Sequence, residues 1–188
     1  MTSALERTGR ALIAIGARLG RASAWLILPM MAAVLAAVAG GLLRVNEVLA
    51  WGVEIPLFGD RLTLTGLAEL QWHLLALLVM LGGAWALAED RHVNVDMISA
   101  RFGPRATAAV RLVGDLIFLL PLCLMIAWYA WGFTEMAWRT GERSDYGGLT
   151  DRWLAKALMP LGFGLLALVG FGRVLLSLAV LFGGRRDG

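Results

Sequence analysis

The sequence of 188 residues is poor in the residue types that form disulfides, metal sites and charged surfaces. It contains one cysteine, two histidines and 16% charged residues, whereas 59% of its residues are hydrophobic and eight are tryptophan. The lone Cys123 excludes a disulfide within the chain. A soluble domain of this length is nearer to about a quarter charged, so the low charge content favours a membrane protein.

Four long apolar runs carry most of the hydrophobicity. They cover about residues 22–43, 67–88, 112–133 and 154–182. At about 1.5 Å per residue, roughly 20 residues cross a hydrocarbon layer of about 30 Å, so each run is long enough to span a membrane. We therefore predict an all-α membrane protein with four transmembrane helices, which form a single domain over residues 1–188.

The first run has a secretory signal peptide as its alternative interpretation, because basic residues precede it. Its apolar stretch is longer than the roughly 7 to 15 residues typical of a signal peptide, and Arg44 follows without a convincing small-x-small cleavage site. We expect a retained membrane anchor.

The basic residues alternate in number between the predicted spans. Four precede the first span, two lie in residues 44–66, four in 89–111, three in 134–153 and two after the last span. The positive-inside rule therefore predicts that both termini and segment 89–111 face the cytoplasm. Because the basic residues are spread over the loops, they favour contact with membrane lipid and not with nucleic acid.

Segment 89–105, "EDRHVNVDMISARFGPR", interrupts the apolar sequence with charge. We predict an amphipathic turn at the cytoplasmic surface, where the backbone can leave a helix without exposing unpaired groups to lipid. Its apolar side chains would contact the headgroups while Arg91, Asn94, Arg101 and Arg105 face water. Pro104 suits the first turn of a helix that continues through Arg111 into the third span.

Ionisable residues inside spans are functional candidates because they are costly in lipid. Glu69 and His73 share one face of the second span, with Gln71 nearby. They are either a proton relay or ion site, or a structural polar cluster that pairs within the chain or with a partner subunit. We favour the cluster, because all three lie within about two turns of the outer interface.

Asp115 and Arg173 are predicted to lie at similar depth near the cytoplasmic ends of the third and fourth spans. They are candidates for an interhelical ion pair. The alternatives are a pair between Asp115 and Arg111 on the same helix, and an Arg173 side chain that extends to the surface by itself.

A charged group at the outer end of the third span also has two interpretations. Its members have helical spacing, so local ion pairs on a solvated helix end are expected. A docking surface for an outside partner is the alternative, supported by Trp138, Tyr146 and Trp153 nearby. The charged members are Glu135, Arg139, Glu142 and Arg143.

Residues for enzyme chemistry are missing from the sequence. A haem-carrying membrane anchor commonly uses paired histidines in its spans, and here only His73 lies within a predicted span. No metal-ligand constellation, phosphate loop or nucleophile motif is present. A membrane anchor of a redox complex and an autonomous small carrier stay open as alternatives to a supporting transport subunit.

The order of these features resembles the small membrane subunit, DctQ-type, of tripartite ATP-independent periplasmic (TRAP) transporters. Similarity extends over roughly residues 20–182. Asn94 departs from the basic residue often found at its position. The matching residues after the second span are His92, Val93, Val95, Asp96, Arg101 and Arg105, and those entering the fourth are Gly148, Leu149, Trp153, Lys156, Pro160, Leu161 and Gly162.

The resemblance implies a subunit that does not itself translocate the solute. A large DctM-type membrane subunit would carry the sodium and substrate sites, and a DctP-type periplasmic binding protein would deliver an organic acid. The "ELQWH" of residues 69–73 is similar to a branch associated with 2-oxo acids and related compounds. This chain would hold no cofactor, would lie in the bacterial inner membrane, and would scaffold the large subunit.

Overall fold

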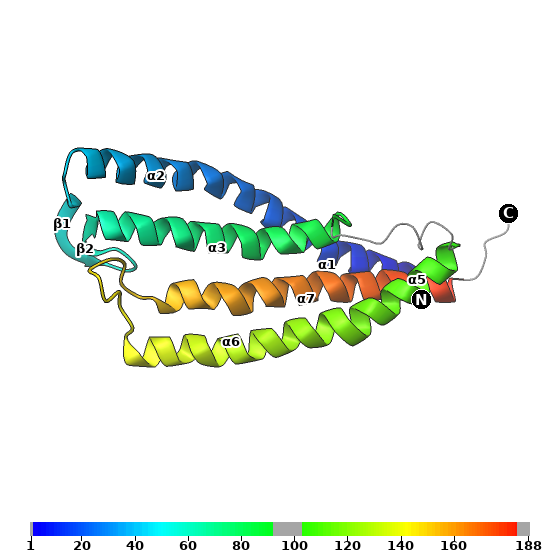
Figure 1. Cartoon of the computed structure of the whole chain (residues 1–188). Coiled ribbons are helices and arrows are strands. Elements are labelled where there is room, and N and C mark those ends of the chain that lie inside the picture. Colours follow the sequence, from blue (N-terminus) through cyan, green and yellow to red (C-terminus); the bar gives the residue numbers. More distant parts are fainter. Residues whose placement is uncertain (1, 92–102, 184–188) are drawn as a thin grey trace. The chain divides into compact units, whose positions relative to one another are not determined.

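The computed structural model describes residues 2–91 and 103–183 of the chain, and four of its helical runs are long and apolar enough to cross a membrane (Figure 1). These runs cover Ser3–Leu42, Leu64–Ala88, Pro104–Thr140 and Trp153–Phe182. The predicted fold class, a helical membrane protein with four spans, is confirmed. The shortest run, Leu64–Ala88, has 25 residues, which is more than the roughly 20 that a hydrocarbon layer of about 30 Å requires.

Two of the runs are composite. The first consists of α1 (Thr2–Ser23), a short 3-10 turn η1 (Ala24–Leu26) and α2 (Ile27–Leu42). The third consists of α5 (Pro104–Gly114), the π-helical turn η2 (Asp115–Leu119) and α6 (Leu120–Thr140). The second and fourth runs are the single helices α3 (Leu64–Ala88) and α7 (Trp153–Phe182).

The start of the third run agrees with the sequence. α5 begins at Pro104, after Gly103 in extended conformation, as predicted from the preference of proline for the first helical turn. The wide turn η2 lies just before Pro121, which has no N–H to bond the carbonyl four residues earlier. Turns of this kind are frequent at functional sites, and this one begins at Asp115.

A β-hairpin between α2 and α3 was not predicted. Strand β1 (Glu47–Ile55) pairs antiparallel with β2 (Gly59–Thr63), with Glu47 opposite Thr63 and Ile55 opposite Gly59. The register shifts twice between these ends, and Gly52 within β1 has a φ of 70°. These irregularities break the alternation of apolar and polar residues that predicts a strand. The sequence of this segment therefore indicates a loop.

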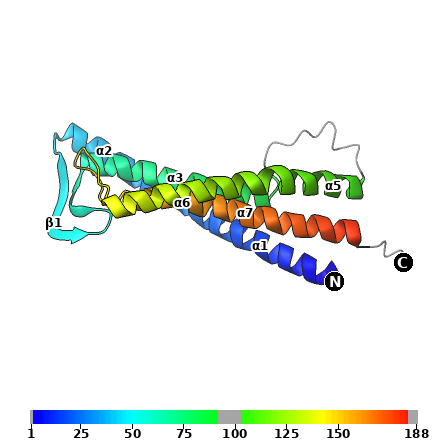
Figure 2. The ribbon, with the colours of Figure 1, turned by 90° about the horizontal axis from the view of Figure 1, so that it is seen from below.

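The chain divides into two compact units, and the first contains Met1–Arg21, Leu81–Ile126 and Gly162–Gly188. Its core contains Ala84, Leu87 and Val169, packed against apolar side chains of α1, η2 and α7. α1 lies along α7 in this unit (Figure 2). Glycine makes this approach possible, since a Cβ on Gly9 would lie 2.8 Å from the carbonyl oxygen of Gly172.

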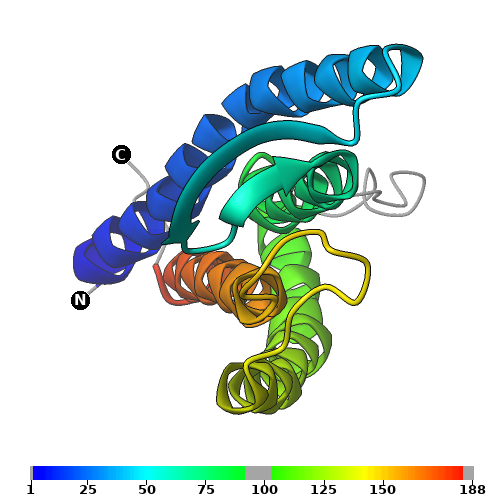
Figure 3. The ribbon, with the colours of Figure 1, turned by 90° about the vertical axis from the view of Figure 1, so that its left-hand side faces the viewer.

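The second unit contains Ala22–Met80 and Ala127–Leu161. In it, the hairpin and the loop of residues 141–152 lie side by side (Figure 3). The N–H of Thr150 donates to the carbonyl of Leu57 over 2.9 Å, and the N–H of Leu57 donates to Asp151 Oδ2 over 3.2 Å. Leu57 and Asp151 both have positive φ, 76° and 52°, so these bonds hold a strained backbone in place.

Substitution of Gly9 by alanine tests the close contact between α1 and α7. The added Cβ meets a backbone oxygen that cannot rotate away, so we expect Gly9→Ala to destabilise the protein by about 1–3 kcal/mol. Gly164→Ala on α7 is the matched control, because nothing lies within 4 Å of its Cβ position. That change should stabilise the helix by about 0.5–1 kcal/mol. Thermal unfolding in detergent measures both, and equal shifts would contradict the contact.

Candidate functional site

A cluster of charged side chains in the first unit joins the turn after α3 to α5, η2 and α7. Arg173 Nε lies 3.0 Å from Asp115 Oδ2, and Arg173 Nη1 lies 2.9 Å from Asp90 Oδ1. Asp90 Oδ2 in turn lies 2.8 Å from Arg111 Nη2. We call Asp90, Arg111, Asp115 and Arg173 the Arg173 cluster. Two acids and two bases leave it without net charge.

The interhelical pair of Asp115 and Arg173 is therefore present in the structure. The two side chains are only 9% and 18% exposed, so the pair is largely shielded from water. Arg111 pairs with Asp90 instead of Asp115, and Arg173 does not extend to the surface by itself. Removal of one partner from such a shielded pair leaves an uncompensated charge, which costs much more than loss of an exposed pair.

Arg173 also closes the end of α3. Its Nη1 donates to the carbonyl of Leu87 over 3.3 Å, and the same carbonyl accepts the N–H of Asp90 over 3.2 Å. Asp90 follows with a φ of 54°, a left-handed conformation that suits the end of a helix. The sequence did not predict these contacts of Asp90, because its position indicated only a charged residue in a solvated turn.

Glu89 anchors a second, exposed contact of the same unit. The Trp85 indole N–H donates to Glu89 Oε1 over 2.6 Å, and Arg21 Nη2 lies 3.3 Å from the same oxygen. The Trp85 hydrogen bond and then Arg21 lower the pKa of Glu89 below its usual value. Arg91, a candidate from the sequence, is 77% exposed and lies 3.9 Å from Glu89.

Glu69 organises the loop of residues 141–152 in the second unit. The Ser144 hydroxyl donates to Glu69 Oε1 over 2.5 Å, and the Leu149 N–H donates to Glu69 Oε2 over 2.7 Å. A Cβ on Gly148 would lie 2.5 Å from the carboxyl carbon of Glu69, so a larger residue would displace this carboxylate. Both carboxylate oxygens thus accept hydrogen bonds from the chain itself. This favours the interpretation of Glu69 as part of a structural polar cluster.

His73 and Gln71 do not join Glu69 through their side chains. His73 Nδ1 lies 2.6 Å from the backbone carbonyl of Glu69, and a carbonyl can only accept, so Nδ1 carries the proton. Nε2 is buried without a hydrogen-bond partner among the described residues. Gln71 lies half-buried on α3. No described bond links His73 to the Glu69 carboxylate, as a relay between them would require.

The four charged residues expected together at the end of α6 form separate ion pairs in the structure. Glu135 and Arg139 form the expected local pair over 2.5 Å. The helix ends at Thr140, so Glu142 and Arg143 lie beyond it and the helical spacing of the whole group is wrong. Glu142 Oε2 lies 2.5 Å from Lys156 Nζ, across the loop.

Two aromatic contacts support this end of the second unit. In the first, the Lys156 ammonium lies 3.8 Å from the ring centroid of Phe133. Beside it, Arg152 Nη1 forms an ion pair with Glu142 Oε1 at 4.0 Å. The rings of Trp138 and Trp153 meet edge to face, with centroids 4.6 Å apart. Trp153 and Lys156, both candidates from the resemblance, therefore hold the start of α7 against the end of α6.

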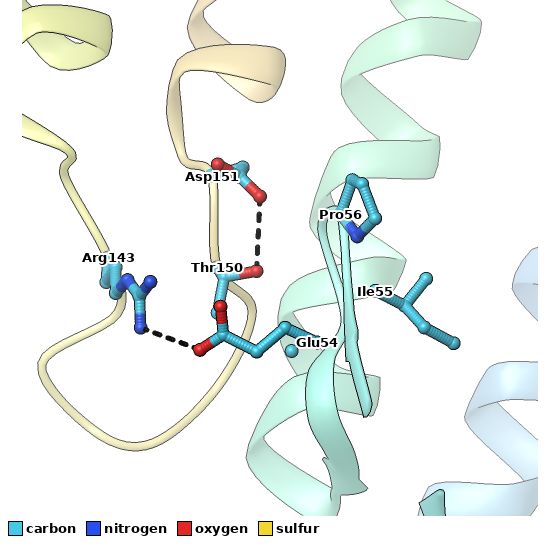
Figure 4. A pocket seen from close by; sticks show the side chains of 7 residues that line it. Glu54, Ile55, Pro56, Arg143, Thr150 and Asp151 are labelled. Carbon is cyan, nitrogen blue, oxygen red and sulfur yellow. Dashed lines mark hydrogen bonds and ion pairs between the residues drawn. The ribbon is translucent and has the colours of Figure 1, made fainter. Parts of the chain in front are cut away.

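A cleft of about 180 Å³ opens between the hairpin and the loop (Figure 4). Its lining is polar: Arg143 Nη1 lies 3.7 Å from Glu54 Oε1, and the Thr150 hydroxyl donates to Asp151 Oδ2 over 3.4 Å. The Glu54 and Arg143 side chains are 76% and 64% exposed. The cleft is thus a feature of the solvated loops and not of the spans.

Three further candidates, His92, Asp96 and Arg101, lie outside the described residues, together with most of the predicted amphipathic turn. Within residues 2–91 and 103–183, no group of three or more His, Cys, Asp and Glu side chains is placed to hold a metal ion.

These features define a class before any comparison: a multi-pass helical membrane protein in which Glu69, Asp115 and Arg173 are bound by other groups of the chain itself. Residues 56–180 match the model of a family described as "Tripartite ATP-independent periplasmic transporters, DctQ component". The chain belongs to this family, so it is the small membrane component of a TRAP transporter and not a member of an enzyme family. No curated protein and no solved structure matches the chain.

Replacement of Glu69 by glutamine tests its role in the loop. The amide offers one acceptor oxygen where the carboxylate offers two, so either Leu149 N–H or the Ser144 hydroxyl loses its acceptor. We expect Glu69→Gln to cost about 1–3 kcal/mol. Glu135→Gln, which breaks an exposed local pair, should cost about 0–1 kcal/mol. Thermal unfolding in detergent distinguishes them, and an equal loss from both would contradict the organising role.

The Arg173 cluster is tested by single and double replacement. Arg173→Met leaves Asp115 shielded and unpaired, so we expect a loss of about 3–5 kcal/mol. In the double variant Asp115→Leu with Arg173→Met, no uncompensated charge remains at Asp115, and we expect a smaller loss than in the single variant. Arg139→Met is the exposed control. Unfolding in detergent is the measurement; a double variant less stable than Arg173→Met would contradict the pairing.

Proposed function

We propose that this chain is a fixed, non-translocating scaffold that holds the large membrane subunit of a TRAP transporter during sodium-coupled uptake of an organic acid. The observation that carries the proposal is the chemistry of its spans. Residues 74–88, 116–134 and 157–172, the central parts of the last three spans, contain no Asp, Glu, Lys, Arg or His. A solute with a carboxylate, or a sodium ion, needs polar partners at this depth.

The polar groups near the span ends support the same function. Glu69 is occupied by the 141–152 loop, and Arg173 is occupied by two aspartates and a backbone carbonyl. A transport site must release its ligand and change its contacts in each cycle. Side chains engaged in this way instead fix helix ends, which is the property that a stationary support needs.

The partners follow from the family. We propose a DctM-type large subunit that carries the sodium and substrate sites, and a DctP-type periplasmic protein that delivers the solute. For the solute we propose an organic acid, a 2-oxo acid or a related carboxylate, because residues 69–73 resemble the branch of the family associated with such compounds. No cofactor of this chain is needed for such a role.

For the placement in the cell, we propose the bacterial inner membrane with both termini in the cytoplasm. The distribution of basic residues between the spans supports this orientation. It places the hairpin and the loop of residues 141–152 on the periplasmic side, and the Arg173 cluster near the cytoplasmic side. A periplasmic binding protein would then face the hairpin and the loop.

Deletion of this chain tests the scaffold function. In cells that still produce the large subunit and the binding protein, we expect uptake of the organic acid to fall to background, because the moving subunit has lost its support. Complementation with the chain should restore uptake. The measurement is accumulation of radiolabelled solute, with the amount of large subunit in the membrane followed by immunoblot. Normal uptake in the deletion strain would contradict the function.

A further inference from the structure

The outward surface of α6 carries several exposed aromatic side chains close together in the sequence. Trp128, Tyr129 and Trp131 are 78%, 73% and 61% exposed. At 100° per residue, the buried Ala130, Thr134 and Ala137 lie on the opposite side of the helix. α6 therefore packs its small side chains inward and presents its largest ones outward.

The positions of two of these residues in the sequence place them well inside the predicted span. The uncharged segment 116–134, between Asp115 and Glu135, corresponds to about 28 Å of helix, close to the thickness of the hydrocarbon layer. Trp128 and Tyr129 are seven and six residues from Glu135, so their backbone lies about 10.5 and about 9 Å inside that end. Trp131 is nearer the end, at the depth where aromatic belts are usual.

The polar atoms of Trp128 and Tyr129 have no partner among the described residues. The indole N–H and the phenol O–H both need an acceptor when they are removed from water. In a helix the Cα–Cβ bonds tilt toward the N-terminus, which for α6 leads away from Glu135 and toward the middle of the membrane. This direction opposes extension of the two side chains to the nearer interface.

The exposed surface of α2 makes the contrast clear. Its outward side chains include Leu28, Met31, Leu35 and Val38, which are 59%, 54%, 66% and 57% exposed. These side chains carry no hydrogen-bond donor, so lipid tails satisfy them fully. Lipid tails offer no acceptor to Trp128 or Tyr129, whereas a neighbouring transmembrane helix can supply one.

We propose that the outward surface around Trp128 and Tyr129, the α6 aromatic face, docks a membrane-spanning helix of the large partner subunit. That helix presents acceptor oxygens, from backbone carbonyls or from Ser, Thr, Asn or Gln side chains, to the Trp128 N–H and the Tyr129 O–H. The proposal rests on the scaffold function. It adds which surface of this chain contacts the large subunit.

Site-specific photocrosslinking of the coexpressed complex tests the proposal. p-Benzoylphenylalanine is placed at residue 129 on α6 or at residue 35 on α2, two positions exposed by 73% and 66% in the structure. We expect a crosslink to the large subunit from residue 129 and none from residue 35. A crosslink from residue 35 alone, or from residue 129 only to a second copy of this chain, would overturn the proposal.

Removal of a single oxygen gives a second test that keeps the ring. Tyr129→Phe should lower the amount of large subunit that co-purifies by about fivefold, the effect of one lost hydrogen bond. Tyr146→Phe removes the same hydroxyl from the loop, where the side chain is 85% exposed, and should leave co-purification unchanged. Equal effects of the two substitutions would overturn the role of the Tyr129 hydroxyl.

Wild-type co-purification separates this inference from the function on which it rests. If the large subunit co-purifies with wild type but neither crosslinks to residue 129 nor responds to Tyr129→Phe, the α6 aromatic face is wrong and the scaffold function stands. If the large subunit does not co-purify with the wild-type chain at all, both are contradicted.

Discussion

A polar group inside a lipid bilayer has to find its partner within the protein, because the hydrocarbon offers none. In this chain that constraint decides which residues matter. Arg173 reaches Asp115, Asp90 and the carbonyl of Leu87, and Glu69 reaches the Ser144 hydroxyl and the Leu149 N–H. Each group uses its bonding capacity to join segments that are distant in the sequence, so the same residues that are costly to place in a membrane also fix the ends of the helices.

The sequence was sufficient for the spans because their signal is a long apolar run, which depends on no tertiary contact. It also placed the start of α5 at Pro104 and identified Asp115 and Arg173 as possible partners. It did not predict the hydrogen bonds and ion pairs that depend on how a loop packs against the helices. Asp90 and Ser144 looked like ordinary loop residues. Lys156 donates to Glu142 across 14 residues, a separation that no local periodicity predicts. The hairpin was missed because Gly52 and two register shifts obscure its alternation.

Membership of the DctQ family and the chemistry of the spans lead to one account of the chain. The central parts of the last three spans are uncharged and offer no charged partner to an anionic solute. Glu69, Asp115 and Arg173, near the span ends, are bound by other groups of the chain. Close helix packing through Gly9 and Gly172 adds rigidity where α1 meets α7. A chain of this kind suits a stationary part of a transporter, whose task is to hold its depth and tilt in the bilayer while another subunit moves. In the function that we propose, the aromatic surface of α6 would offer hydrogen-bond donors to a neighbouring helix within the membrane.

Solute flux through reconstituted protein tests the central claim, that this chain supports transport without providing the path. The purified chain is placed in liposomes by itself, and in parallel together with the large subunit, under an inward sodium gradient and with the loaded binding protein outside. The account predicts that the chain by itself gives no uptake above empty liposomes, and that the two subunits together accumulate the organic acid. Sodium-dependent uptake by the chain alone would contradict it.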